Sequence, residues 1–246
     1  MKAFLDNLLL DCKLDEDNSD PLLIARNLPD DAMLICALFA YGNVTAMIKF
    51  LRSLNFELLN ASDSEIRENL KNHYYRFQSP NDVIYVFCAF AKMRRENIIF
   101  EEIFTQNYKK DGFLFALSEF IALLRKYIKS DSQGINFLFS KPFDHKNISG
   151  VSALKRYFMY LRWQIRAGFP DLGRWREISP ADLIIPLDTH TFHQAKKLGL
   201  LTRNTADLKA ALELTAKLRE FDADDPIKYD FALYRLGQNA PKRSLK

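Results

Sequence analysis

Two residues of this 246-residue chain have side chains and neighbours suited to breaking a bond at a sugar carbon, Lys155 and Asp188. A lysine attacks carbon only as a neutral amine, so its pKa must fall from about 10.4 toward neutrality through burial and neighbouring cations. Arg156 adjoins Lys155, and apolar residues follow it. A carboxylate such as Asp188 stabilises positive charge that develops on a sugar as its base departs, and it helps to move protons.

Both residues are expected at the start of a helix. The sequence GVSALK at 150–155 joins a glycine-containing turn to the lysine that opens an aromatic-rich helix, and PLDTH at 186–190 places the aspartate at the start of another. Singly, each has an ordinary explanation, since such a lysine is usually a solvated charge and such an aspartate usually caps the helix. The two motifs together favour a functional pair.

The sequence PLDTHTF at 186–192 resembles the P-L/V-D-T-H-x-F element of the helix-hairpin-helix (HhH-GPD) DNA glycosylase superfamily, in which the aspartate is catalytic. Lys155 matches the hairpin lysine of that superfamily. Two features differ from its pattern: the interval from Lys155 to Asp188 is longer than in endonuclease III, and the hairpin lacks the second glycine of the usual G-x-G. The longer interval is similar to that of the archaeal GO glycosylases, which excise 8-oxoguanine.

The chain also resembles an uncharacterised bacterial family labelled only as a domain of unknown function (DUF2400-like). This resemblance lies in KRYFMYLRW at 155–163, the PLD of the motif above, and KYDFALYRLG at 228–237. We interpret that family as a bacterial relative of the archaeal group. The resemblance covers most of the chain beyond Asp31 and is strongest after Gly150. It implies an all-α, two-lobed glycosylase-like fold with a base pocket between the lobes.

The resemblance also implies which residues hold the base. Asp230 and Tyr234 lie four apart on one helix face, and they match a D-x-x-x-aromatic element in which the carboxylate accepts from the purine edge, although tyrosine here replaces a tryptophan. The alternative is that this helix only packs its tyrosine and bonds its aspartate to a neighbouring lobe. Phe158 and Met159 follow Lys155 by three and four residues, so at least one is expected against the flipped base; aromatic residues at this spacing more often form a core.

Contacts with the DNA backbone are expected from the hairpin and from basic side chains. The N–H groups of Gly150, Val151 and Ser152 and the positive end of the following helix suit a phosphate. Further DNA contacts are expected from Arg156, His190, Lys196, Lys197 and Arg203. His193 stands where relatives often have an arginine, which puts a phosphate contact there in doubt.

Asn43, in the sequence YGNV at 41–44, interrupts an otherwise apolar helical pattern. Such a local exception often marks a site, and the resemblance implies a side chain here that fills the gap left by the flipped base or contacts its orphaned partner. A break between two short helices is the alternative.

The charge is uneven along the chain, whose net charge is +4. From Ser140 onward there are 19 Lys and Arg against 12 Asp and Glu, and before it 16 against 19. The basic part contains the proposed chemistry, as a phosphate-binding face should. An ordinary basic surface is the alternative.

The cysteines Cys12, Cys36 and Cys88 are far apart and near apolar sequence, so we interpret them as core thiols of a reducing compartment. Three thiols cannot supply the four thiolates of an iron-sulfur cluster. The four histidines lack the spacing of a zinc site. We therefore predict neither a metal nor a cofactor.

Apolar residues recur at helical spacing over 32–54, 83–93 and 113–127, and Ser-Pro pairs at 79–80 and 179–180 mark helix starts. We expect one all-α glycosylase unit over 1–246, with two lobes joined near 130–147, a polar loop at 15–20 and a loose basic tail at 239–246. We expect neither a signal peptide nor a membrane span. We expect a monomer in the cytoplasm, associated with the nucleoid if the source is bacterial.

These observations predict a bifunctional DNA glycosylase and AP lyase that excises 8-oxoguanine from duplex DNA in base excision repair. Its partner is damaged double-stranded DNA. Two alternatives remain: a non-catalytic helical DNA-binding protein, and a glycosylase for a different damaged base.

Overall fold

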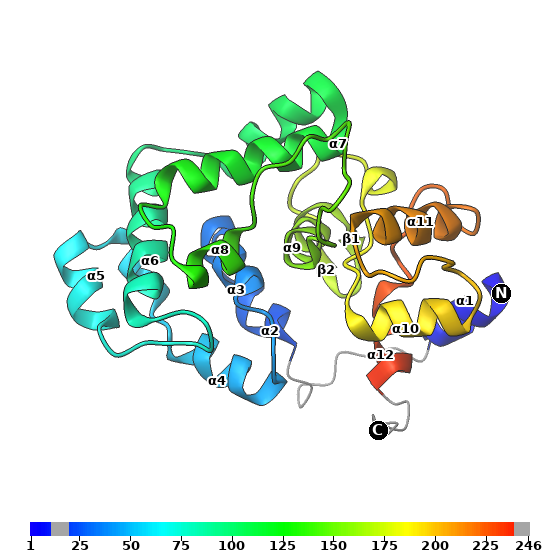
Figure 1. The fold of residues 1–246 in the computed structure, drawn as a ribbon, viewed down its shortest axis with the longest axis horizontal. Helices are drawn as coiled ribbons and strands as arrows, with labels where there is room; N and C mark the ends of the chain where they lie inside the picture. The colour runs from blue at the N-terminus through cyan, green and yellow to red at the C-terminus, as the bar shows by residue number, and fades with distance from the viewer. Residues whose placement is uncertain (11–19, 239–246) are drawn as a thin grey trace. The chain divides into compact units, whose positions relative to one another are not determined.

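The computed structural model describes residues 1–10 and 20–238, and this part of the chain is mostly helical, with twelve α-helices and one two-stranded sheet (Figure 1). The predicted all-α class is thus confirmed at the level of helical content. Cys12, the tail at 239–246 and all but the end of the predicted loop at 15–20 lie outside the described residues. Within the described part, no helix is both long and apolar enough to cross a membrane.

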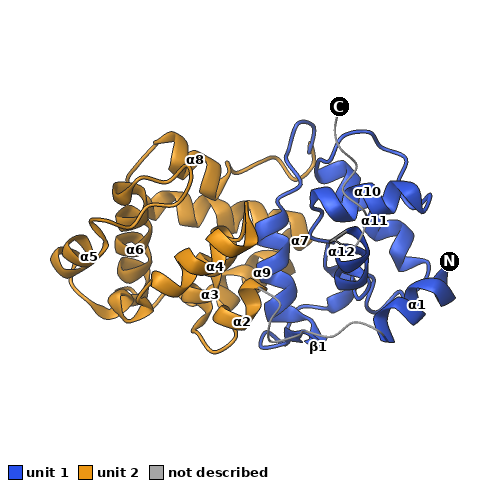
Figure 2. Ribbon diagram, turned by 90° about the horizontal axis from the view of Figure 1, so that it is seen from below, with its two compact units in different colours: residues 1–15, 148–246 blue, residues 16–147 orange. Residues whose placement is uncertain are grey.

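The chain divides into two compact units (Figure 2). Unit 1 comprises residues 1–15 and 148–246, and unit 2 comprises residues 16–147. The first helix of the chain therefore belongs with the C-terminal residues, a pairing that no local sequence pattern indicated.

Unit 2 is built from helices with strong local start signals. At the start of its second-longest helix, Ser79 and Asp82 form a reciprocal capping box with Pro80 in the first turn, a combination that satisfies two backbone N–H groups and presets the helical φ. The helices of unit 2 are α2 (Pro21–Ala25), α3 (Asp30–Leu38), α4 (Val44–Ser53), α5 (Asp63–Leu70), α6 (Pro80–Arg95), α7 (Phe100–Tyr127) and α8 (Gln133–Phe139), with a 3-10 turn at Phe56–Asn60.

The apolar run predicted over 32–54 is two helices, α3 and α4, rather than one. The chain breaks at Gly42, whose φ of +88° a residue with a side chain rarely adopts. A Cβ at this glycine would also lie 2.7 Å from an Arg76 guanidinium nitrogen. The positive φ therefore accounts for the break, and the Arg76 side chain packs against the glycine.

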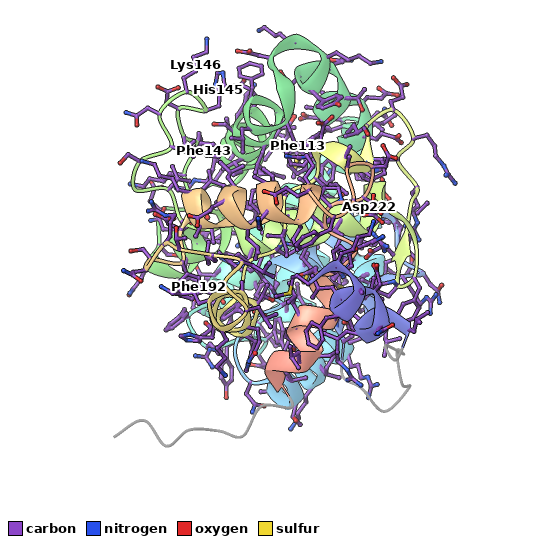
Figure 3. All side chains as sticks on the ribbon, turned by 90° about the vertical axis from the view of Figure 1, so that its right-hand side faces the viewer. Phe113, Phe143, His145, Lys146, Phe192 and Asp222 are labelled. Atoms are coloured by element: carbon purple, nitrogen blue, oxygen red, sulfur yellow. The ribbon has the colours of Figure 1, made fainter. Side chains whose placement is uncertain are left out.

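α7 is kinked at Asp111 and Gly112, which leave helical geometry. His145 Nε2 lies 2.9 Å from Asp111 Oδ2, so the loop that carries His145 and Lys146 is fixed at this kink (Figure 3). Beyond the kink, α7 buries Phe120 against Phe104 and Phe100 in the core of unit 2.

Unit 1 forms around one almost wholly buried helix. Every residue of α9 from Tyr157 to Ile165 is buried, and a short hairpin folds back on its C-terminal end, where Trp175 N donates to Gln164 O at 2.8 Å. The elements of unit 1 are α1 (Lys2–Leu10), α9 (Lys155–Ile165), β1 (Ala167–Gly168), β2 (Asp171–Leu172), α10 (Thr189–Lys197), α11 (Leu208–Arg219) and α12 (Asp230–Gln238), with a 3-10 turn at Pro180–Asp182.

The C-terminal helix α12 is held from two sides in unit 1. It packs against α10 and against α1, where Leu5 is fully buried and Asp6 Oδ1 accepts from the Tyr229 hydroxyl at 2.7 Å. The loop before it is closed by Lys228, whose Nζ donates to Asp222 Oδ2 at 2.6 Å. The position of Asp230 at the start of α12 is thus fixed within unit 1.

Candidate active site

Lys155 is the first residue of α9 and follows a tight turn. Gly150 has a φ of +76° and Leu154 a φ of 48°, so the turn uses left-handed backbone at both ends. Leu154 O accepts from the backbone of Tyr157 at 3.0 Å and so begins the helix without a side-chain cap. A turn with left-handed backbone at both ends thus leads directly into the helix that Lys155 opens.

The predicted hairpin is tied to the start of α11. Ser152 pairs with Asp207 in an antiparallel bridge, and Leu208 N donates to Val151 O at 3.0 Å. Asp207 also caps α11 by accepting from Ala210 N at 2.9 Å. The segment predicted to bind phosphate is therefore hydrogen-bonded to the start of α11.

One face of α9 carries the predicted nucleophile. Lys155, Met159 and Arg162 lie at positions i, i+4 and i+7, which share a helix face. Lys155 Nζ is 3.5 Å from Met159 Sδ, and Phe158 is fully buried in the core. Of the two residues predicted to pack against a base, Met159 is thus the one beside the amine.

Arg162 continues this face into the interior, where it joins two carboxylates. Its NH1 donates to Asp230 Oδ2 and its Nε donates to Asp171 Oδ1 at 3.0 Å. The exposed fractions of the three side chains are only 7% for Arg162, 7% for Asp230 and 1% for Asp171. Charges this buried persist only when they are paired and hydrogen-bonded.

The ionic contacts extend further through Arg166. Its NH1 donates to Asp171 Oδ2 at 3.0 Å, and its Nε donates to Asp225 Oδ2 at 2.9 Å. The result is a continuous row of alternating charges, here called the Asp–Arg chain, that links α9, the β1–β2 hairpin and the segment before α12. Its members are Asp230, Arg162, Asp171, Arg166 and Asp225.

The pKa of Asp230 depends on the charges of two other predicted site residues, Lys155 and Asp188. Burial raises the pKa of Asp230 to about 6, the positive charges of Arg162 and Lys155 oppose that rise, and the negative charge of Asp188 adds to it. Lys155 and Asp188 therefore lie close enough to Asp230 to influence its charge. The two predicted catalytic residues and the predicted base-binding carboxylate share one neighbourhood in unit 1.

Asp188 is half-buried at the start of α10, where its Oδ1 accepts from Thr191 N at 2.8 Å. This is the helix-capping contact expected of an aspartate in that position. Capping fixes the orientation of the carboxylate. The contact is therefore compatible with a structural role and with the predicted catalytic role.

Tyr234 lies one turn after Asp230 on α12, with its ring edge-on to His190 at 6.0 Å between centroids. Gly237 allows this approach of α12 to α10, because a Cβ there would lie 2.8 Å from the His190 Cβ. The predicted base-binding tyrosine and the predicted DNA-contacting histidine are thus neighbours.

The predicted phosphate-contacting cations differ in their surroundings. Lys196 donates to Arg203 O at 3.1 Å, and Arg203 NH2 donates to Asp207 Oδ2 at 2.6 Å, so both stabilise the loop after α10. Lys197 and His193 are exposed on α10, and Arg156 is half-buried. Asn43 belongs to unit 2, is exposed, and caps α4 by accepting from Ala46 N at 3.0 Å.

Sequence reasoning missed four members of the Asp–Arg chain. Arg162 did carry a signal, because it is a charge within a helix of aromatic and apolar residues, seven positions after Lys155. Asp171, Arg166 and Asp225 carried none, since each lies in or beside a turn where charged residues are common. None of the described His, Cys, Asp and Glu residues forms a group of three or more that could hold a metal ion.

A family model described as "Protein of unknown function (DUF2400)" matches residues 20–239. The chain belongs to this family. The DUF2400 match includes α9, the start of α10 and α12, and it confirms the resemblance to that family predicted from the sequence. No curated protein and no solved structure matches the chain. The relationship of DUF2400 to the helix-hairpin-helix glycosylases stays a prediction.

Proposed function

We propose that the protein is a bifunctional DNA glycosylase and AP lyase that excises 8-oxoguanine from duplex DNA. The observation that carries the proposal is that Lys155 and Asp188 lie near enough to Asp230 to act on its charge. These three residues stand in the motifs that resemble the superfamily, and they come from the starts of three different helices of unit 1. The proposal includes the two-lobed helix-hairpin-helix fold, with damaged double-stranded DNA as the partner.

In the proposed reaction, the neutral amine of Lys155 attacks C1′ of the damaged nucleotide, and the bond between C1′ and the base breaks. The base leaves with the bonding electrons and takes up a proton. Asp188 stabilises the positive charge that develops on the sugar. Loss of the ring oxygen from C1′ then gives a Schiff base between Lys155 and the opened sugar.

The lyase step follows from that Schiff base. Removal of a proton from C2′ allows β-elimination, which breaks the C3′–O bond and releases the 3′ phosphate as leaving group. Water then hydrolyses the Schiff base and returns the amine of Lys155. Strand cleavage therefore requires the same nitrogen as base release.

Base recognition is assigned to the carboxylate of Asp230, which accepts from the N–H groups of the purine edge, with Tyr234 and Met159 against the ring. The half-buried Tyr234 and the position of Met159 beside Lys155 support these two roles. Phe158 is enclosed in the core, so we assign it a packing role rather than contact with the base.

The test is borohydride trapping on duplexes that carry one 8-oxoguanine opposite cytosine, with undamaged, abasic and oxidised-pyrimidine duplexes alongside. We expect a covalent complex with the wild-type protein on the 8-oxoguanine duplex, and none with Lys155→Gln, which should still bind DNA. Lys217→Gln is the matched control, because Lys217 is a half-buried lysine of the same unit, paired with Glu220.

Each outcome separates the hypotheses. Trapping only on another damaged duplex would keep the chemistry and favour a glycosylase for a different base. Tight, salt-sensitive binding with no trapping on any duplex would favour a non-catalytic DNA-binding protein. Full activity of Lys155→Gln would remove Lys155 as the nucleophile.

A further inference from the structure

We propose that Arg162 is a positioning residue that orients the base-reading carboxylate of Asp230 relative to Lys155. The inference rests on the proposed function and deepens it, because it names the group that sets how the substrate base is read. The KRYFMYLRW motif and the family match both include Arg162, but neither assigns it a role.

The contact between Arg162 and Asp230 joins two helices of unit 1. Arg162 comes from α9 and Asp230 from α12, and the guanidinium NH1 donates to Asp230 Oδ2 inside unit 1. A planar guanidinium holds a carboxylate in a defined orientation, which an ammonium on a flexible stem does not. The guanidinium is itself held from the other side by Asp171, so it cannot rotate away without losing a buried contact.

The proposed nucleophile and the residue that anchors Asp230 lie on the same helix. Lys155 and Arg162 are seven residues apart on the same face of α9, about 10 Å along the helix axis. Asp225, five residues before Asp230, is also bound by Arg166, the residue that follows α9. One end of the segment 225–230 is thus bound to α9 and the other to its C-cap, which restrains the carboxylate of Asp230 relative to the helix that carries Lys155.

The charge of Arg162 also acts on Asp230. The charges that act on Asp230 are Arg162 and Lys155 from α9, Asp171 from β2 and Asp188 from the start of α10. On the elements packed against α12, His190 of α10 contacts Tyr234, and Asp6 of α1 accepts from Tyr229. Arg162 is the main positive charge that opposes the effect of burial on Asp230. Without it, the carboxyl group takes up a proton at higher pH and presents an O–H where the purine edge presents N–H donors.

The experiment compares two single-turnover rates from pH 5.5 to 8.5: excision of 8-oxoguanine from a duplex and reaction with a duplex that carries an abasic site. Both need the Lys155 amine, but only the first needs the base to be read. The ratio of the two rates therefore cancels the titration of the amine. The variants are Arg162→Met and Arg162→Lys, with Arg219→Met as control, since Arg219 is an exposed arginine of α11.

For the wild type we expect the ratio to fall as the pH drops through about 6. For Arg162→Met we expect the fall to move up by about one to three pH units, because an adjacent opposite charge shifts a carboxyl pKa by that much. Arg162→Lys keeps the charge, so its ratio should fall near the wild-type pH but should be lower throughout, because the planar contact is lost. Arg219→Met should match the wild type.

The outcomes are distinguishable. If Arg162→Met fails to fold, Arg162→Lys carries the test, and a wild-type ratio for that variant would overturn the inference. An equal loss of both rates in the folded variants would also overturn it, because it would indicate a merely structural role. If the wild-type protein reacts with neither duplex, the proposed function itself fails.

Discussion

Asp188 combines a structural contact with proposed chemistry. Its Oδ1 accepts from Thr191 N, and its negative charge raises the pKa of Asp230. Asparagine caps helices as well as aspartate does but has no charge. Replacement by asparagine therefore separates the two roles within one residue.

We predict that Asp188→Asn slows single-turnover excision of 8-oxoguanine by about 100-fold or more, as expected for loss of a charge that stabilises the transition state. The melting temperature should stay close to that of the wild type because the cap is kept. Asp20→Asn is the control, since the Asp20 side chain also caps a helix, accepting from Leu22 N at the start of α2. An unaffected excision rate for Asp188→Asn would remove this residue from the mechanism.

At the same scale, short sequence motifs singled out Lys155, Asp188 and Asp230 as candidate site residues. They did not predict the partner of Asp230. A buried ion pair such as Arg162 with Asp230 depends on the packing of α9 against the start of α12, and no local spacing encodes that contact. Phe158 shows the same limit, since periodicity alone could not decide whether it or Met159 faces the amine.

Among the elements, those with local start signals were predictable and those fixed by tertiary contacts were not. The Ser79-Pro80 pair begins α6 as predicted, whereas Ser179-Pro180 begins only a 3-10 turn. The β1–β2 hairpin was missed because strands of two residues have no alternating pattern. The break at Gly42 had a local signal, but its close approach to Arg76 did not.

The hairpin before α9 gives a prediction at the element scale. Gly150 has left-handed backbone and open space where a Cβ would lie, so Gly150→Ala adds strain of about 1 kcal/mol and no clash. That strain should lower the melting temperature by about 2–4 °C in a chain of this size. If the turn relaxes to relieve it, DNA affinity should fall by up to about fivefold.

Gly199→Ala is the matched control, because Gly199 also has a positive φ and open space but lies after α10, outside the hairpin. Both variants should lose similar thermal stability, and only Gly150→Ala should bind DNA more weakly. Equal DNA affinities, measured by fluorescence anisotropy on an abasic duplex, would argue against phosphate binding by the hairpin.

On the scale of the whole molecule, the residues of the proposed chemistry lie in unit 1, which contains only a short part of the N-terminal sequence. Unit 1 contains Lys155, Asp188, Asp230 and the Asp–Arg chain, and it gains α1 from the other end of the sequence. The excess of positive charge also falls in the residues from 140 onward. Linear sequence could show the charge bias, but it could not show that α1 packs against α12.

This distribution predicts how DNA binding depends on salt. The logarithm of the association constant should fall linearly with the logarithm of salt concentration. Lys197→Gln removes an exposed cation of unit 1 and should reduce the slope by about 0.9. Lys71→Gln, which removes an exposed lysine of unit 2, should leave the slope unchanged. The reverse result would move the phosphate contacts to unit 2.

The central claim is that the Lys155 nitrogen forms the covalent bond to the sugar. The most direct measurement is proteolysis and mass spectrometry of the borohydride-reduced adduct formed on an 8-oxoguanine duplex. We predict that the sugar remnant is attached to Lys155 and to no other amine of the chain. A remnant attached to a different lysine or to the N-terminus, or no adduct at all, would contradict the account.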